Sequence, residues 1–121
     1  MEHREKGRVV VSLEVRRELT NSWGAIHGGV LMTLLDTSMA FAARTAAADV
    51  IGVMTVDMTA SFIRSATGRL VAEGRILYGA RSLVFCEGEA RNAAGELIAK
   101  AIGTFMLKHA GEDTGADDER A

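Results

Sequence analysis

The chain has 121 residues, 48% of them hydrophobic, and its 14 basic and 16 acidic side chains give a net charge of -2. This size allows one domain with one core, which we place in residues 1–108, and leaves the acidic residues 109–121 as a disordered tail. The charge argues against a nucleic-acid-binding surface, and no segment approaches the roughly 20 apolar residues of a membrane span. Because the first residues, MEHREKGR, lack the apolar segment of a signal peptide, we expect a cytoplasmic protein.

The first predicted elements are a strand and a long helix. Residues 8–13 are rich in β-branched side chains and predict a short strand. Residues 28–47 predict a helix, in which the only polar side chains up to Ala43 are Thr33, Asp36, Thr37 and Ser38. A helix that is apolar on nearly every side is expected to be buried.

Four further strands are predicted after the helix. Residues 51–63 alternate apolar even-numbered positions with polar odd-numbered ones, which is typical of a half-buried strand. The connections between the later strands have hairpin length and contain Gly79 and Gly95. These later strands cover residues 70–78, 83–91 and 97–108. The order predicts an α+β fold in which a four-strand meander joins the first strand in an antiparallel sheet, curled round one long helix.

Cysteine and histidine are too sparse for an internal disulfide or a recognisable metal site. Cys86 is the only cysteine and lies within a predicted strand, where a buried and unreactive thiol is expected. His3 and His109 lie in the flanking segments and are expected at the surface. His27 is then the one histidine that belongs to a motif.

Asp36 is the most informative side chain of the helix. A carboxylate among apolar residues is costly, and chains retain one when it is paired, protonated or catalytic. Taken alone, Asp36 is equally well explained as a hydrogen-bonding partner of a neighbouring hydroxyl or arginine.

The start of the helix favours the catalytic alternative. His27, Gly28 and Gly29 stand where a Ser, Thr or Asp cap is common, so the first N–H groups are left accessible to a ligand. The helix dipole adds positive potential there, which suits a polarised carbonyl oxygen and requires no metal or cofactor.

Gly28 and Asp36 are too far apart to act on one carbonyl group within one chain. Eight residues of helix correspond to a rise of about 12 Å, and the tilt of side chains recovers little of it. If both groups act on one substrate, two antiparallel helices must meet across a two-fold axis. The sequence therefore predicts a homodimer with two shared sites.

The spacing of these residues resembles that of a known family. Asn21, the turn His27-Gly28-Gly29 and Asp36, with the strand sequence VMTVDM and the closing segment GELIA…GTF, are similar to hot-dog-fold acyl-CoA thioesterases of the phenylacetate-degradation (PaaI-like) type. The resemblance spans roughly residues 13–107. It implies a hydrolase, without a cofactor, that cleaves an acyl-CoA and forms a homodimer that pairs into a homotetramer. An aryl or phenylacetyl type of acyl group is preferred by the resemblance, and a medium-chain or housekeeping substrate stays open.

The resemblance also assigns roles to residues. It implies that the Gly28 N–H binds the thioester oxygen, that Asn21 and His27 shape this side of the site, and that Asp36 is the base or nucleophile. Thr55 falls where some relatives place a hydroxyl beside the acid. The alternation, however, puts Thr55 on the strand face opposite Met54 and Val56, so only a bulge or a subunit boundary would bring it to Asp36.

Contacts to CoA and two other functional classes stay open at this stage. Arg64, Arg69 and Arg81 lie at strand ends or connections, where they can meet the CoA phosphates or remain solvated surface side chains. A hot-dog hydratase or dehydratase is the main alternative, although His27 lacks a second carboxylate of its own. A non-catalytic acyl-CoA-binding protein is the other.

Overall fold

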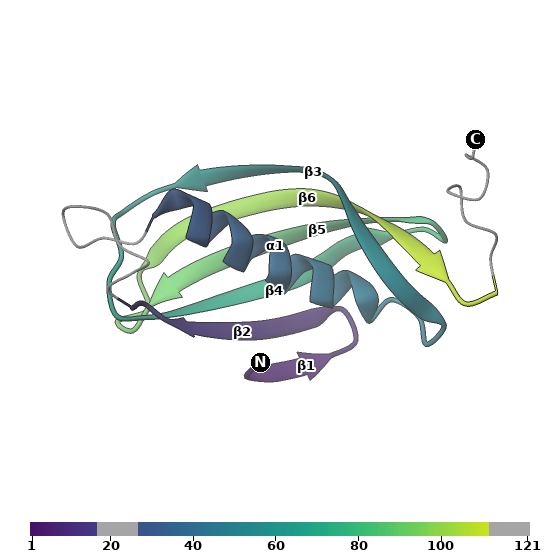
Figure 1. Ribbon diagram of the computed structural model, residues 1–121, viewed down its shortest axis with the longest axis horizontal. Coiled ribbons are helices and arrows are strands. Elements are labelled where there is room, and N and C mark those ends of the chain that lie inside the picture. The colour runs from purple at the N-terminus through teal and green to yellow at the C-terminus, as the bar shows by residue number, and fades with distance from the viewer. Residues whose placement is uncertain (17–26, 112–121) are drawn as a thin grey trace.

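The computed structural model describes residues 1–16 and 27–111 and contains one helix and six strands in that part of the chain (Figure 1). Six of the seven elements match the predicted ones to within a few residues. The unpredicted element is a three-residue strand at the N-terminus. The elements are β1 His3–Glu5, β2 Arg8–Glu14, α1 Gly28–Arg44, β3 Val50–Phe62, β4 Arg69–Gly79, β5 Leu83–Asn92 and β6 Leu97–His109.

The strands form one antiparallel sheet in the order β1-β2-β4-β5-β6-β3. The predicted four-strand meander is therefore wrong in one connection. Only β4, β5 and β6 follow one another in space, whereas β3 pairs with β6, for example through Met54 opposite Met106. The chain between β3 and β4 must cross to the other side of the sheet, so β3 becomes an edge strand.

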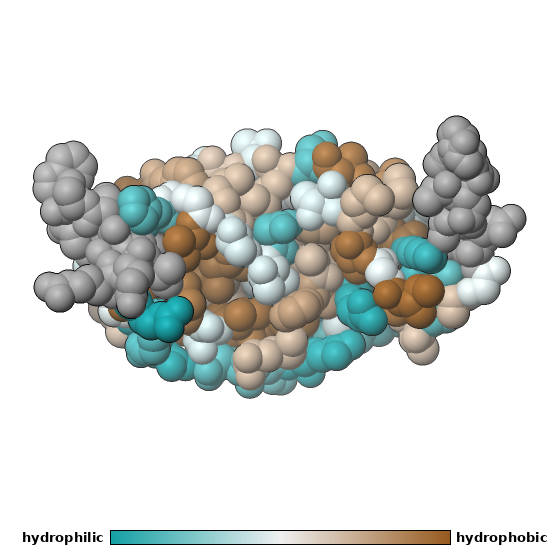
Figure 2. Space-filling view, viewed as in Figure 1, coloured by the Kyte–Doolittle hydropathy of each residue, from teal (hydrophilic) through white to brown (hydrophobic). Residues whose placement is uncertain are grey.

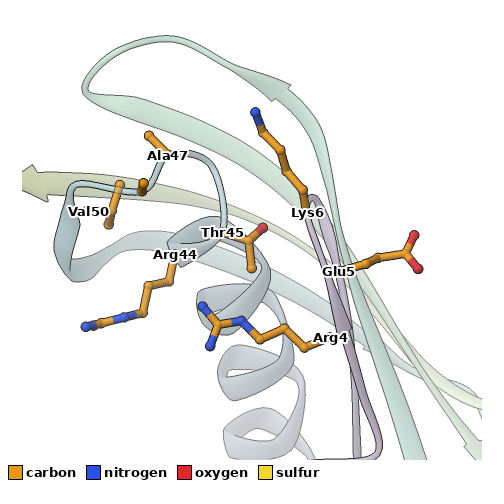
Figure 3. Close-up of a pocket in the computed structure, with 8 residues that line it drawn as sticks. Arg4, Glu5, Lys6, Arg44, Thr45, Ala47 and Val50 are labelled. Atoms are coloured by element: carbon orange, nitrogen blue, oxygen red, sulfur yellow. The ribbon is translucent and has the colours of Figure 1, made fainter.

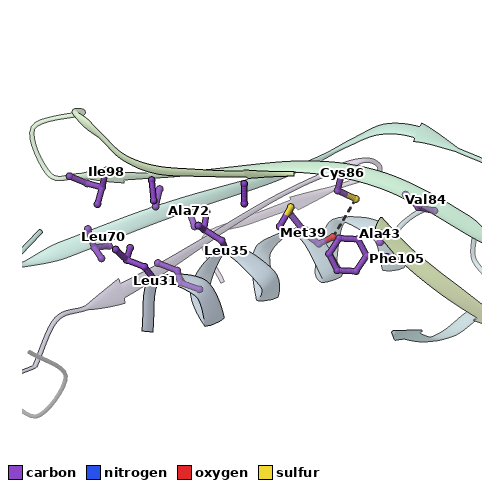
Figure 4. Close-up of a cluster of buried hydrophobic side chains, with 14 of the residues drawn as sticks. Leu31, Leu35, Met39, Ala43, Leu70, Ala72, Val84, Cys86, Ile98 and Phe105 are labelled. Carbon is purple, nitrogen blue, oxygen red and sulfur yellow. Dashed lines mark hydrogen bonds between the residues drawn. The ribbon is translucent and has the colours of Figure 1, made fainter. Parts of the chain in front are cut away.

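The core lies between α1 and the face of the sheet that curves around it (Figures 1 and 4). One stripe of α1 is buried, at spacings of three and four residues, as expected for a helix packed on one side. Side chains from β2 to β6 complete the core. The fully buried residues include Leu35, Met39, Leu70, Val84, Ile98 and Phe105.

Glycine in the sheet allows α1 to lie very close to it. A Cβ built at Gly74 of β4 would lie 2.2 Å from the backbone oxygen of Ser38, a distance that real atoms do not adopt. At Gly88 of β5 a Cβ would meet the side chain of Met39 at 3.1 Å. The hydroxyl of Ser38 is buried with α1 and donates to the oxygen of Leu35 at 2.9 Å.

Strand β3 does not keep one alternation along its length, contrary to the prediction. Thr55 pairs with Phe105 and Asp57 with Thr104, so Val56 is an extra residue that shifts the register. From Val53 to this bulge the odd-numbered residues face α1, and after it the even-numbered Met58 and Ala60 do. Met54 and Val56 are consequently 63% and 51% exposed, although the simple pattern placed them inside.

His109 is a second correction, because it is buried and not a surface residue. It is the last residue of β6 and only 2% exposed. Its Nδ1 lies 2.9 Å from Oδ1 of Asp49, and its Nε2 lies 2.7 Å from the oxygen of Arg81. Strand β6 thus includes His109, the first residue of the predicted tail, while residues 112–121 of that tail lie outside the described residues.

Three smaller expectations have mixed outcomes. Helix α1 ends at Arg44, three residues before the predicted end, and Thr45 turns the chain by donating its N–H to the oxygen of Ala42. Cys86 is fully buried, and burial raises the pKa of its thiol to about 12, as expected for an unreactive cysteine. His3 is exposed, as predicted.

Candidate active site

The start of α1 presents backbone N–H groups to solvent. His27 is the cap residue, with φ -66° and ψ 143°, and its side chain makes no capping hydrogen bond. Within the described part of the chain, the N–H groups of Gly28 and Gly29 have no acceptor, and both residues are exposed. Four unpaired N–H groups and the dipole are general features of a helix start, and the two glycines leave room for a ligand to approach them.

The surroundings of this turn are partly defined. A Cβ at Gly28 would lie 3.8 Å from the ring of Phe62, at the end of β3, so the space beside the N–H groups is bounded by an aromatic ring. His27 is exposed and close to the turn, as expected. Asn21 lies outside the described residues, so its assignment stays a prediction.

Asp36 and Thr55 meet in the structure. The hydroxyl of Thr55 donates to Oδ1 of Asp36 at 2.8 Å, which joins the middle of α1 to β3. The bulge at Val56 is the reason. Thr55 precedes the bulge, so it lies in the segment of β3 whose odd-numbered residues face α1. The hydroxyl also orients the carboxylate and leaves its second oxygen available for another partner.

Asp36 is not a buried carboxylate within one chain, which corrects the expectation from the apolar helix sequence. Its side chain is only partly covered, and Thr55 is exposed. The helix has one buried stripe, and Asp36 lies beside that stripe on the flank facing β3. Any full desolvation of this carboxylate therefore requires a substrate or a second chain.

The structure keeps Gly28 and Asp36 apart, as the sequence predicts. Both belong to the continuous helix α1, and their separation by eight residues corresponds to a rise of about 12 Å. Asp36 lies next to β3, which pairs with β6 on one side and has no neighbouring strand on its other side within the described chain. The acid is therefore at the open edge of the sheet.

An apolar groove runs beside the helix start, between α1 and β2. It has a volume of about 690 Å³, and its lining includes His27 and Gly29 together with apolar side chains of both elements. Figure 2 shows apolar surface in this region, next to the N-terminal half of α1. The apolar residues that line it are Val11, Leu13, Val30 and Leu34.

The three arginines that the sequence offered for CoA do not gather at one place. Arg64 donates to the oxygen of Leu97 at 3.2 Å and lies 3.8 Å from Glu96, and Arg69 contacts Glu2 at 2.7 Å. Arg81 lies at the other end of the sheet, 3.8 Å from Asp49. Each guanidinium thus has a carboxylate of the same chain within salt-bridge distance.

Within the described residues, a metal-ligand cluster and a membrane-spanning helix are both absent. No group of three or more His, Cys, Asp or Glu side chains there is arranged to hold a metal ion. Likewise, no helix in the described ranges has the length and apolar character needed to cross a membrane.

The chain is similar in sequence to known proteins. A family model described as the thioesterase superfamily matches residues 24–99, which is more than half of the chain. A protein of Saccharolobus solfataricus, provisionally named as an esterase, is 33% identical over 104 residues, covering 85% of this chain and 74% of its own length.

Solved structures share the fold. The E. coli PaaI protein from the phenylacetic acid degradation operon superposes with a TM-score of 0.80 at 22% identity, over 86% of this chain and 75% of its own. A Streptococcus mutans protein bound to acetyl-CoA has a TM-score of 0.80 at 25% identity, over 87% of this chain and 84% of its own. These matches confirm the hot-dog fold that the sequence motif predicted.

Proposed function

The chain belongs to the thioesterase superfamily, as a hydrolase of thioester bonds, and from this premise we propose that it cleaves an acyl-CoA to the free acid and CoA. The observation that carries the proposal is the hydrogen-bonded Thr55–Asp36 pair at the open edge of the sheet. The start of α1, which has no side-chain cap, would supply the other half of the site from a second chain. The acetyl-CoA found in the Streptococcus mutans structure supports an acyl-CoA as the ligand class.

In the proposed reaction, the N–H of Gly28 binds the thioester oxygen and stabilises the negative charge that develops on it. Asp36 accepts a proton from a water molecule as the water oxygen attacks the carbonyl carbon. The carbon–sulfur bond then breaks, the acid is released, and the CoA thiolate takes up a proton. Direct attack by Asp36 through a mixed anhydride is the alternative course, and we favour the water route.

The complete site requires two chains. We propose that two copies pair through their β3 edges, so that the helix start of one copy lies beside Asp36 of the other. Strand β3 is 13 residues long and has an unpaired edge within the described chain, which is the kind of edge that proteins usually cover. Pairing there also desolvates Asp36 and strengthens it as a base. A further pairing into a homotetramer is part of the proposal.

The acyl group can bind next to the turn at the start of α1. The groove between α1 and β2 includes His27 and Gly29, and its other lining is mainly apolar. An acyl chain bound there would have its carbonyl near the N–H groups at the helix start. We propose an aryl or phenylacetyl group as the acyl part, on the similarity to the phenylacetate-degradation type of thioesterase.

Complementation between two inactive variants tests the shared site. In Gly28→Val the new side chain crowds the position of the thioester oxygen. The fold is expected to be retained, because the new Cβ would meet only the Phe62 ring, at 3.8 Å. In Asp36→Asn the charge is lost while the shape is kept, and hydrolysis is expected to fall at least about 100-fold. Release of the CoA thiol, measured with a thiol-reactive dye, reports hydrolysis and would stay silent for hydration or mere binding.

Refolding the two variants together gives the decisive result. About half of the dimers are then mixed, and in each mixed dimer one site carries both lesions and the other carries none, so about a quarter of the wild-type activity returns. A site built within one chain would show no recovery, because every site would still contain one lesion. Absence of recovery in a mixture whose mixed dimers are verified by mass would refute the shared site.

A further inference from the structure

A basic hollow lies at the C-terminal end of α1, away from the residues assigned to catalysis. It has a volume of about 520 Å³ and lies between the β1–β2 hairpin, the end of the helix and the start of β3. Its basic lining side chains are Arg4, Lys6 and Arg44. Figure 3 shows Arg4 extending from β1 towards the end of α1, where Arg44 lies, while Glu5 points the opposite way.

The charges of this hollow are not neutralised within the described chain. Arg4, Lys6 and Arg44 form no ion pair there, and Arg44 only donates to the backbone oxygen of Ile51 at 3.4 Å. The one carboxylate of the lining, that of Glu5, is directed to His3 at 2.6 Å and to Arg8 at 3.7 Å. Most other arginines of the described residues do pair with a carboxylate, namely Arg8, Arg64, Arg69, Arg75, Arg81 and Arg91.

The walls of the hollow are held together by specific hydrogen bonds. Gly7, at the tip of the β1–β2 hairpin with φ 85°, donates its N–H to the hydroxyl of Thr45 at 2.7 Å. That hydroxyl donates in turn to the oxygen of Ala42 at 2.6 Å, and the oxygen of Gly7 accepts from Ile76 at 2.9 Å. The hairpin that carries Arg4 is therefore tied to the helix end that carries Arg44.

Three basic side chains line this one hollow, and positive charges gathered around a hollow favour the binding of an anion. Guanidinium groups bind phosphate through paired, charge-assisted hydrogen bonds, which makes a phosphorylated compound the best-matched ligand. The negative end of the helix dipole is partly offset, because the N–H groups of Thr45 and Ala46 bond the last-turn oxygens of Ala42 and Ala43.

We propose that this hollow binds the phosphates of the CoA nucleotide, a role that rests on the proposed function. Arg44 follows Asp36 by eight residues on the same helix, a rise of about 12 Å. The pantetheine arm contains two amide units and has the reach of about four extended residues, roughly 13 Å. A thioester at Asp36 can thus place its nucleotide at the hollow of the same chain, while the acyl group points to the partner's helix start.

Direct binding tests the hollow without relying on hydrolysis. The probes are CoA, adenosine 3′,5′-bisphosphate and pantetheine, titrated by calorimetry into the wild type and into an Arg4→Gln/Arg44→Gln variant. Each lost charge-assisted contact is expected to weaken binding of CoA and of the bisphosphate about tenfold. Pantetheine, which lacks phosphate, is expected to bind both proteins equally. Both arginines are exposed, so the variant is expected to keep the wild-type urea midpoint.

A matched control removes a different surface arginine. Arg91 pairs with Glu89 at 3.1 Å on the face of the sheet opposite α1, so Arg91→Gln is expected to leave CoA binding unchanged. The proposal is overturned if the wild type does not bind the bisphosphate, if the double variant binds CoA as tightly as the wild type, or if Arg91→Gln weakens binding equally.

The kinetic constants separate the hollow from the catalytic proposal. The double variant is expected to raise KM for an acyl-CoA, with no change for the corresponding acyl-pantetheine. If the KM for acyl-CoA stays at the wild-type value, the hollow is refuted and the thioesterase activity stands. If the wild type binds CoA through these arginines but hydrolyses neither thioester, the hollow stands and the proposed function fails.

Discussion

The hydrogen bond between Thr55 and Asp36 gives the sharpest test of the site in one substitution. Thr55→Val keeps the shape and the strand preference of the residue but removes the hydroxyl that donates to Oδ1 of Asp36 at 2.8 Å. A hydrogen bond to a charged acceptor contributes about 1.5–3 kcal/mol, and the lower end applies because water can reach the partly exposed carboxylate. About 1.5 kcal/mol corresponds to a tenfold decrease in kcat. KM is expected to change little, because the hydroxyl contacts the acid and not the substrate.

Matched variants distinguish a positioned acid from a general effect on the strand. Thr55→Ser retains the hydroxyl and is expected to recover most of the activity. Thr59→Val makes the same chemical change on the outer face of β3, opposite Ile102, and is expected to behave as the wild type. The assay is steady-state thiol release, with urea unfolding of each variant. A wild-type kcat in Thr55→Val, or an equal loss in Thr59→Val, would disprove the positioning of Asp36 by this hydroxyl.

Two predictions concern the stability of the fold. Gly74→Ala is expected to lower the free energy of unfolding by about 3 kcal/mol, because its Cβ would lie 2.2 Å from the oxygen of Ser38 and push α1 off the sheet. Gly52→Ala, whose Cβ meets its nearest neighbour at 3.7 Å, should change the urea midpoint little, and an equal loss in both variants would contradict this explanation. His109 contributes a pH-dependent term, because its hydrogen bond to Asp49, and then that to a backbone oxygen, raises the pKa of its imidazole above the ordinary value. The stabilisation of the wild type over His109→Gln should therefore be complete below a pH of about 6 and disappear as the pH rises through the raised pKa, and urea midpoints that differ equally at all pH values would refute it.

The local sequence patterns determined most of the secondary structure. The apolar stripe of α1, its glycine-rich start and the alternation in the strands each depend on neighbours within a few residues, so their positions can be predicted without knowing the fold. The same holds for the distance between Gly28 and Asp36, because the geometry of a helix follows from the count of residues. The need for a second chain was thus an inference from the sequence itself.

The pairing of strands and the phase of β3 were decided by the tertiary structure. The hairpin connections of the later strands are local, but the choice of β6 as the partner of β3 depends on residues between 37 and 59 positions apart in the chain. The bulge at Val56 has no local signal, since the alternation continues through it, and yet it determines that Thr55 faces Asp36. A one-residue shift reverses the face of every later side chain in a strand, so the pattern was read correctly only on one side of the bulge.

Electrostatic partners also depended on the fold. The sequence shows that arginines are present but not which carboxylates approach them, so Arg64, Arg69 and Arg81 looked as available as any others. Folding brings each of these three to an acidic residue, and it gathers Arg4 and Arg44, which are forty positions apart in the chain, in one hollow. His109 likewise looked like part of a polar tail, and only the position of Asp49 in the turn before β3 makes its burial possible. Charge pairing acts through space and not along the chain, which is why the sequence suggested the proposed catalytic motif but not the charged side chains around it.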